Sequence, residues 1–364
     1  MATPPYSYAN PIVAPAGGQG GYAERPWRAT SAAAAAGLWE SFGAGIWAEN
    51  YPSLYKRRAA DTIDHYEREE QGFRSGVSIM LDLLPYVRRP ISTLTAVASD
   101  PIESWMRFRE QYAAHREGRT PPDLYKVEKG WEARLHDLIG LPSPGEMTQE
   151  FWALWPKVIE KLEANGVRAG PESFKGWNDG DAGFVRAIWC LVRILRPTKV
   201  IETGVAHGVT SRFILEGLEK NGRGHLWSID RPPIEREWKS QIGIAIDRRL
   251  EHRWSYILGS SRRRLPGILS QLGEIDLFIH DSLHSERNVR FEMDRAWVAL
   301  RPGGAIVVDD IDVNRGFHSF TEFFSGCRSI ICESEPLRPE LRRVNKKGMF
   351  GIVRKEPVGW SNGQ

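Results

Sequence analysis

The sequence predicts an α/β fold in which a seven-stranded, mostly parallel sheet carries helices on both faces and follows a helical N-terminal region. Two observations predict this fold. From about residue 180 onward, short apolar runs alternate with amphipathic helical patterns, which is typical of parallel strands joined by crossover helices. The first of these runs leads into a turn that contains Gly204 and Gly208, and a helical pattern leaves it. Because glycine has no Cβ, a small molecule can lie against bare backbone at this turn.

Composition and charge narrow the class of protein. The chain has 364 residues and a formal net charge of +3, from 49 basic and 46 acidic side chains, so we expect no nucleic-acid or membrane partner. The basic block 262–264 is predicted to be solvated surface. The cysteines have no zinc-binding spacing, and the N-terminus lacks the pattern of a signal peptide. The best apolar candidate for a membrane span, 182–195, is interrupted by two arginines, so we expect a cytoplasmic protein.

The first half of the chain has no group of residues typical of catalysis. Residues 1–53 are rich in Pro, Gly and Ala and are predicted to be flexible, whereas residues 54–170 are predicted to form a helical cap or dimerisation region. Apolar residues at helical spacing, separated by proline-rich breaks, predict helices over 104–117, 130–139 and 148–165. The apolar faces of these helices favour a homodimer or a higher homo-oligomer.

Residues 171–356 are predicted to form the α/β domain, and residues 357–364 a tail. Five buried strands are predicted over 199–202, 225–230, 254–258, 275–280 and 305–309. Helices are predicted over 181–195, 208–220 and 285–300. A turn is predicted over 301–304, directly before the fifth strand. Two further strands, 329–332 and 349–353, have no long helix between them, so we expect them to close the sheet as an antiparallel pair.

The turn after the first strand, 202–211, is the most informative stretch of the chain. It lacks the G-x-G-x-x-G pattern of dinucleotide sites, which argues against the alternative of an oxidoreductase. Its pattern E-x-G-x-x-x-G resembles motif I of the class I S-adenosylmethionine-dependent methyltransferases, which have a Rossmann-like sheet. Asp230 ends the second strand and is predicted to accept hydrogen bonds from both ribose hydroxyls of the cofactor. The residues expected to bind the cofactor are Glu202, Thr203, Gly204, Ala206, His207, Gly208, Ser211, Asp230, Ser260 and Asp281.

Acidic residues also follow the fourth and fifth predicted strands. Asp281, Asp309 and Asp310 are expected at the same edge of the sheet as the glycine turn, where their charges repel one another unless a cation or a proton intervenes. Mg²⁺ or another hard divalent cation prefers such oxygen ligands, so these three residues are the predicted metal ligands. His284 is predicted to act as the general base, with Asp281 beside it. His280 is a candidate to support this group from behind.

These elements carry a second, narrower resemblance. The D-x-x-H-S element after the fourth strand, the L-R-P-G-G turn and the D-D pair resemble the macrocin-type sugar and macrolide O-methyltransferases, and are similar to the cephalosporin-hydroxylase-like and catechol-type enzymes. The resemblance covers about residues 175–355. It implies methyl transfer from S-adenosylmethionine to a hydroxyl of a sugar, a polyketide or a catechol-like molecule that is held by Mg²⁺. Two alternatives stay open, a metal-independent methyltransferase and a noncatalytic binding subunit with the same fold.

Overall fold

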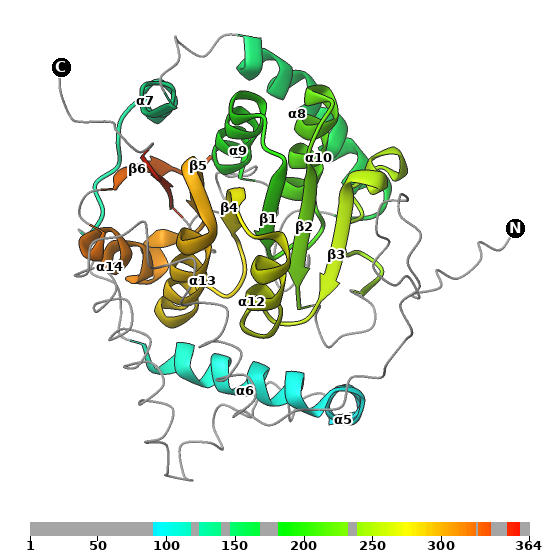
Figure 1. The fold of residues 1–364 in the computed structure, drawn as a ribbon. Helices are drawn as coiled ribbons and strands as arrows, with labels where there is room; N and C mark the ends of the chain where they lie inside the picture. The colour runs from blue at the N-terminus through cyan, green and yellow to red at the C-terminus, as the bar shows by residue number, and fades with distance from the viewer. Residues whose placement is uncertain are drawn as a thin grey trace, which may run out of the picture. The chain divides into compact units, whose positions relative to one another are not determined.

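The structure is a computed structural model, shown in Figure 1, and it describes residues 90–117, 124–139, 146–167, 181–231, 239–324, 327–335 and 348–356. The chain divides into two compact units, Met1–Met80 and Leu81–Gln364, and every described residue belongs to the second. The predicted flexible segment 1–53 and the predicted tail 357–364 lie outside the described residues, and the predicted domain boundaries stay predictions. No described helix combines the length and the apolar character that crossing a bilayer requires.

Within the described residues, one sheet contains seven strands in the order β3-β2-β1-β4-β5-β7-β6. Strands β1 to β5 pair in parallel, whereas β7 pairs antiparallel with both β5 and β6. The predicted sheet and its antiparallel closure are therefore confirmed. The strands are β1 (Lys199–Thr203), β2 (His225–Asp230), β3 (Trp254–Leu258), β4 (Ile275–His280), β5 (Leu300–Val308), β6 (Arg328–Glu333) and β7 (Met349–Arg354).

Strand β5 differs from its prediction. It begins at Leu300, although the sequence predicts a separate turn over 301–304 before the strand. The pairing with β4 explains the difference: Ile275 faces Leu300, whereas Leu277 faces Ala305. More residues of β5 than of β4 lie between these two pairs, so the predicted turn is an irregularity inside the strand.

Helices cover both faces of the sheet, as predicted (Figure 1). Successive strand residues point to opposite faces, so the neighbours Val200 and Ile201 enter different hydrophobic clusters. The cluster of Val200 includes helices α7 to α10, and the cluster of Ile201 includes helices α12 to α14. Among the described residues after 180, the helices are α9 (Ala182–Leu195), α10 (Val209–Asn221), α12 (Ser261–Leu272), α13 (Glu286–Ala299) and α14 (Gly316–Phe323), with 3₁₀ turns η1 (Arg248–Arg253) and η2 (Ile311–Val313).

The described helices before residue 170 are α5 (Pro90–Ser99), α6 (Pro101–Arg116), α7 (Trp131–Ile139) and α8 (Glu146–Ala164). Helix α6 is capped by Asp100, whose carboxylate accepts a hydrogen bond from the amide of Glu103 at 3.0 Å. Helix α8 buries Phe151 and Trp155 in the same cluster as α9 and α10. The last helices of the predicted cap region therefore share the core of the sheet.

Helix α6 lies across the carboxyl-terminal edge of the sheet, below the strand ends in Figure 1. Its Glu110 is buried and accepts a hydrogen bond from Nη1 of Arg231 at 2.8 Å, and its other oxygen lies 3.5 Å from Nε of Arg262. The guanidinium of Arg262 lies 4.5 Å from the ring centre of Phe291. The prediction that the basic block is solvated surface is wrong for Arg262, because these contacts leave only 12% of its side chain exposed. One acidic side chain thus ties α6 to two segments at this edge.

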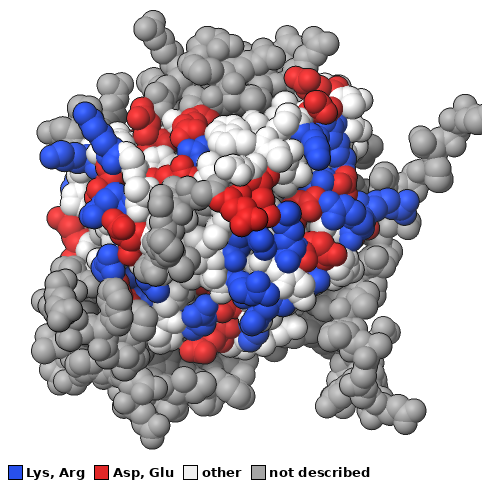
Figure 2. Space-filling model, turned by 90° about the horizontal axis from the view of Figure 1, so that it is seen from above, with Lys and Arg blue, Asp and Glu red and all other residues white. Residues whose placement is uncertain are grey.

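Acidic and basic side chains are intermixed on the face of the molecule seen in Figure 2. Basic side chains of the described residues pair with acidic ones across element boundaries, for example Arg253 with Glu219 at 2.6 Å and Lys220 with Glu150 at 3.1 Å. Such pairs neutralise charge locally, in agreement with the net charge of +3.

Candidate functional site

The residues that follow strands β1, β4 and β5 lie at one edge of the sheet. Thr203, His280 and Val308 pair across these three strands. The residues that come next in the chain are therefore neighbours: they are Gly204, Asp281 and Asp309. This register places the glycine turn and both acidic clusters at the same edge, where ligands bind in open α/β sheets.

The turn after β1 brings backbone close to backbone. Gly204 has φ +87°, and a Cβ there would lie 1.9 Å from the carbonyl oxygen of Asp281. Gly208 has φ +82°, and a Cβ there would lie 2.8 Å from the Cα atom of Gly243. Only glycine fits these two positions without a shift of the backbone. Between them, Ala206 has φ +47°, and its carbonyl accepts a hydrogen bond from the amide of Gly243 at 2.9 Å.

A cavity of about 250 Å³ lies beside this turn. The predicted cofactor residues in its wall are Gly204, Ala206, Asp230, Ser260 and Asp281. Helix α6, the end of β3 and the loop before α13 complete the wall. Together with two residues from the end of β2 and the first turns of α12 and α13, these segments supply Glu110, Gln111, Ile229, Arg231, Gly259, Ser261, Ser282, Leu283 and Asn288.

Other predicted cofactor residues support the turn from behind. Glu202 is fully buried, and its Oε2 accepts hydrogen bonds from the hydroxyls of Ser211 at 2.6 Å and Ser228 at 2.7 Å. These bonds tie β1 to α10 and to β2. His207 is also fully buried, and its Nε2 lies 3.1 Å from Oε1 of Gln241. Direct contact with a cofactor stays a prediction for Glu202, Thr203, His207, Gly208 and Ser211, as it does for the predicted residues in the cavity wall.

The burial of Glu202 predicts a dependence of stability on pH. Burial raises the pKa of Glu202 from 4.5 to about 8, although the hydrogen bonds from Ser211 and Ser228 lower it. Between pH 4.5 and 8, the folded protein therefore holds a proton that the unfolded chain has released. The contribution to the free energy of unfolding is complete below the lower value and is lost as the pH rises through the higher one. Its size is on the order of 4 kcal/mol.

We expect Glu202→Gln to remove this dependence, because the amide is neutral at every pH and can still accept both hydrogen bonds. Urea unfolding of the cofactor-free protein at several pH values between 5 and 8.5 measures it. Glu274, which is exposed, provides the control. Glu274→Gln should retain the wild-type pH profile, and a Glu202→Gln variant that also retained it would contradict the role of burial.

Asp230 presents a buried acceptor that has no hydrogen-bond partner among the described residues. Its Oδ2 atom is the acceptor, and the residue lines the cavity. Burial raises the pKa of this carboxyl to about 6, against the lowering effects of the amide and the positive charge of Arg231. A buried carboxylate oxygen beside a cavity is satisfied by a ligand that donates hydrogen bonds. The two neighbouring hydroxyls of a ribose are donors of this kind.

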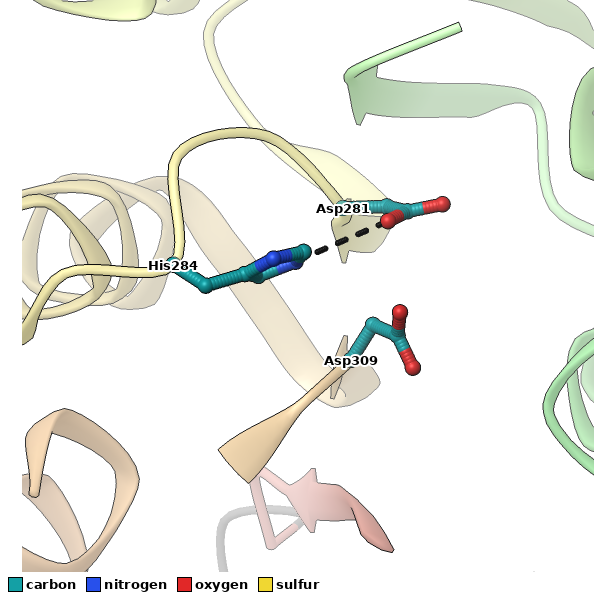
Figure 3. Close-up of side chains that lie close together, drawn as sticks. All are labelled: Asp281, His284 and Asp309. Atoms are coloured by element: carbon teal, nitrogen blue, oxygen red, sulfur yellow. Dashed lines mark ion pairs between the residues drawn. The ribbon is translucent and has the colours of Figure 1, made fainter. Parts of the chain in front are cut away.

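Asp281, His284 and Asp309 direct their side chains toward a common space (Figure 3). One ligand atom of each residue lies within 4.8 Å of those of the other two. Nε2 of His284 is 3.6 Å from Oδ1 of Asp281. Carboxylate oxygens and an imidazole nitrogen at these separations are a donor set that fits a divalent cation.

Asp310 lies on the other side of the His284 ring. Its Oδ2 is 3.2 Å from Nδ1 of His284, so the ring stands between Asp310 and Asp281. The sequence predicts Asp310 as a third metal ligand, whereas the structure groups His284 with the two other aspartates. A histidine that ligates a metal through one nitrogen is commonly oriented by a carboxylate at the other nitrogen.

Glu292 of α13, which the sequence pattern does not single out, lies fully buried behind this cluster. Its Oε2 is 2.7 Å from Nδ1 of His280 and accepts a hydrogen bond from the hydroxyl of Thr203 at 2.6 Å. Its Oε1 accepts hydrogen bonds from the hydroxyl of Ser282 at 2.8 Å and from Nδ2 of Asn288 at 2.9 Å. Burial by itself would raise the pKa of Glu292. The positive charge of His280, its hydrogen bond and the bonds from the other donors have a larger, opposite effect, and they lower this pKa to about 2.

Helical spacing provides a signal for Glu292. The buried face of this helix contains Val289, Met293 and Ala296 at helical spacing, and position 292 lies on the same face. An acidic residue on an inward face requires partners, because an unpaired buried charge is costly. Its partners come from β1 and β4, which the helical pattern alone does not identify.

Comparisons with known proteins extend this description. A family model described as a methyltransferase domain matches residues 201–311. The match contains the glycine turn, Asp230 and the cluster of Asp281, His284 and Asp309, and it confirms the predicted methyltransferase domain over this part of the chain. Among the curated proteins, no sequence matches this chain.

The solved structures that are similar to the chain include two O-methyltransferases. The O-methyltransferase TomG from Streptomyces achromogenes, involved in tomaymycin synthesis and in complex with S-adenosylmethionine, is 16% identical with a TM-score of 0.38 and covers 68% of this chain and 96% of its own. An O-methyltransferase from Bacillus cereus in complex with S-adenosylhomocysteine is 16% identical with a TM-score of 0.39 and covers 62% of this chain and 97% of its own. At these values, neither structure assigns a substrate or a site residue to this chain.

Proposed function

We propose that this chain, which contains a methyltransferase domain, is an S-adenosylmethionine-dependent O-methyltransferase that acts on a hydroxyl of a small molecule such as a sugar, a polyketide or a catechol. One observation carries the proposal. The bare backbone of Gly204 lines one cavity with Asp230, whose Oδ2 has no hydrogen-bond partner within the described ranges, and Asp281 joins that cavity to the cluster with His284 and Asp309. A site for a ribose and a site for a polarised hydroxyl are thus adjacent.

In this proposal, the cavity holds the cofactor through its backbone and through Asp230. Gly204 and Ala206 allow close approach to the main chain, and Oδ2 of Asp230 accepts hydrogen bonds from the ribose. S-adenosylmethionine supplies an electrophilic methyl group on its sulfonium. The wall formed by α6 and by the loop before α13 excludes water from the cavity and orients the acceptor toward it.

The acidic cluster fits a divalent cation, Mg²⁺ or a close relative, with Asp281, Asp309 and Nε2 of His284 as its ligands. Such a cation lowers the pKa of a hydroxyl that it binds and fixes its direction. Asp310 orients the His284 ring through Nδ1. In the metal-independent alternative, Nε2 of His284 takes up the proton of the substrate hydroxyl, and Asp310 stabilises the resulting positive ring.

Replacement of Asp230 tests the cofactor site. We expect Asp230→Ala to weaken the binding of S-adenosylhomocysteine at least about tenfold, because it removes a charged acceptor of hydroxyl hydrogen bonds. Isothermal titration measures the dissociation constants. Asp137→Ala is the control, since its carboxylate on α7 is 65% exposed. Equal affinity in Asp230→Ala and wild type would remove Asp230 from this role.

The same titrations separate the proposal from its rivals. Wild-type protein that binds NADH and fails to bind S-adenosylhomocysteine would support a dinucleotide enzyme. Binding without release of S-adenosylhomocysteine from S-adenosylmethionine, in the presence of sugars, polyketide alcohols and catechols, would favour the noncatalytic subunit. The homo-oligomeric state, the cytoplasmic location and the expected lack of nucleic-acid or membrane partners stay predictions.

A further inference from the structure

Glu292 is a buried charge whose hydrogen-bonding partners come from separate parts of the chain. Thr203 ends β1, His280 ends β4, Ser282 belongs to the loop after β4, and Asn288 lies one turn earlier on α13. The distances to these partners lie between 2.6 and 2.9 Å. All available directions of the carboxylate are therefore used, and a buried charge is tolerated only under this condition.

The two oxygens of Glu292 serve two different sides of the site. Oε2 holds the strand ends, through Thr203 and His280, and Thr203 directly precedes Gly204. Oε1 holds the loop that carries Asp281 and His284, through Ser282 and Asn288. One rigid carboxylate thus fixes the glycine turn relative to the loop of the acidic cluster.

The loop is held by a second layer of contacts that also depends on Glu292. Nδ2 of Asn288 donates to the hydroxyl of Ser282 at 3.1 Å and to the carbonyl of Leu283 at 3.2 Å, besides its bond to Glu292. Ser282, Leu283 and Asn288 line the cavity, whereas Glu292 lies behind them. The carboxylate therefore reaches the ligand site through other side chains.

We propose that Glu292 is a positioning residue that sets the distance between the cofactor turn and the loop of Asp281 and His284, so that one side chain aligns the methyl donor with its acceptor. This inference rests on the proposed function. It requires the carboxylate itself, because both of its oxygens accept hydrogen bonds. An amide of the same shape would turn a donor toward one of the two pairs of partners.

The test compares Glu292→Gln with Asp294→Asn, a change at another acidic residue of α13. Asp294 pairs with Arg290 at 3.0 Å on the same helix and lies outside the cavity wall. The probes are S-adenosylhomocysteine alone and Mn²⁺ alone, titrated into the full chain, with thermal unfolding of each variant. We expect Glu292→Gln to raise the dissociation constants of both probes by about 10-fold or more. This is the effect typical of replacing a residue that orients the binding side chains without contacting the ligand itself. Asp294→Asn should lower the unfolding temperature and leave both constants within about twofold of wild type.

The outcomes separate the inference from the function on which it rests. If wild type binds both probes and Glu292→Gln binds them equally well, the positioning role is overturned and the proposed function is retained. If Asp294→Asn weakens binding as much as Glu292→Gln, the effect is general loss of packing and the inference is also overturned. If wild type binds neither probe, the proposed function fails, and the inference fails with it.

Two further variants keep the test decisive if Glu292→Gln does not fold. Thr203→Val removes a donor on the turn side, and Ser282→Ala removes a donor on the loop side. We expect Thr203→Val to weaken mainly the binding of S-adenosylhomocysteine and Ser282→Ala to weaken mainly the binding of Mn²⁺. Each dissociation constant should rise about threefold or more. Unchanged constants in both variants would overturn the proposal.

Discussion

Gly204→Ala is expected to abolish detectable binding of S-adenosylhomocysteine and to lower the free energy of unfolding by at least about 3 kcal/mol. The added methyl group would lie 1.9 Å from the carbonyl oxygen of Asp281, where both partners are backbone. The φ of +87° adds the cost of a left-handed conformation, about 1–2 kcal/mol. Relief of the overlap requires β1 and the loop after β4 to separate, and this separation disrupts the cofactor turn. Urea unfolding and titration calorimetry measure the two effects.

Gly222→Ala provides a matched control for this prediction. Gly222 ends α10 with φ +68°, and a Cβ there meets nothing within 4 Å. An alanine at this position has the conformational cost of a positive φ without the steric overlap. We therefore expect Gly222→Ala to lower the free energy of unfolding by about 1 kcal/mol and to bind S-adenosylhomocysteine as tightly as wild type. If Gly204→Ala were as mild as Gly222→Ala, the close approach of the turn to Asp281 would be wrong.

Asp309→Asn is expected to weaken the binding of Mn²⁺ or Mg²⁺ about 100-fold or more and to reduce methyl transfer accordingly, with the affinity for S-adenosylhomocysteine within about twofold of wild type. The variant removes one of the negative charges that meet at the cluster with Asp281 and His284. An amide oxygen is a weaker ligand for a hard cation than a carboxylate oxygen. Metal titration of the purified protein, with and without S-adenosylhomocysteine, measures the loss.

Asp310→Asn separates the two possible sets of metal ligands. If Asp310 orients His284 through Nδ1, its replacement should weaken metal binding only about tenfold. A loss as large as that of Asp309→Asn would restore Asp310 as a ligand. Wild-type protein that binds no divalent cation, and that transfers methyl groups unchanged in the presence of a chelator, would favour the metal-independent alternative.

The sequence predicts the strands β1 to β4 well because their apolar runs are short and bounded by turn residues. Strand β5 is predicted less well, since the pairing of Ile275 with Leu300 is a contact between distant residues. The sequence also leaves α12 unpredicted, because Pro266 and the block 262–264 hide its apolar positions, Leu265 and Leu269.

Some residues of the candidate site can likewise be predicted from the sequence, whereas others cannot. Gly204, Asp230 and Asp281 are identifiable from the sequence, because each follows or ends a predicted strand at the carboxyl-terminal edge. Glu110 and Glu292 are not, since their roles depend on partners that only the folded chain brings near them. Strand order determines which loops are neighbours, but hydrogen bonds between side chains determine which atoms remain available to a ligand.

Because α6 supplies Glu110 and Gln111 to the wall of the cavity, the N-terminal helices and the methyltransferase domain are not interchangeable parts. A shortened protein that started at residue 171 would leave Arg231 and Arg262 without their acidic neighbour and would remove the part of the cavity wall that α6 forms. Exchange of these helices for those of another protein would consequently change which cofactor analogues fit, even though every residue of the glycine turn stayed the same.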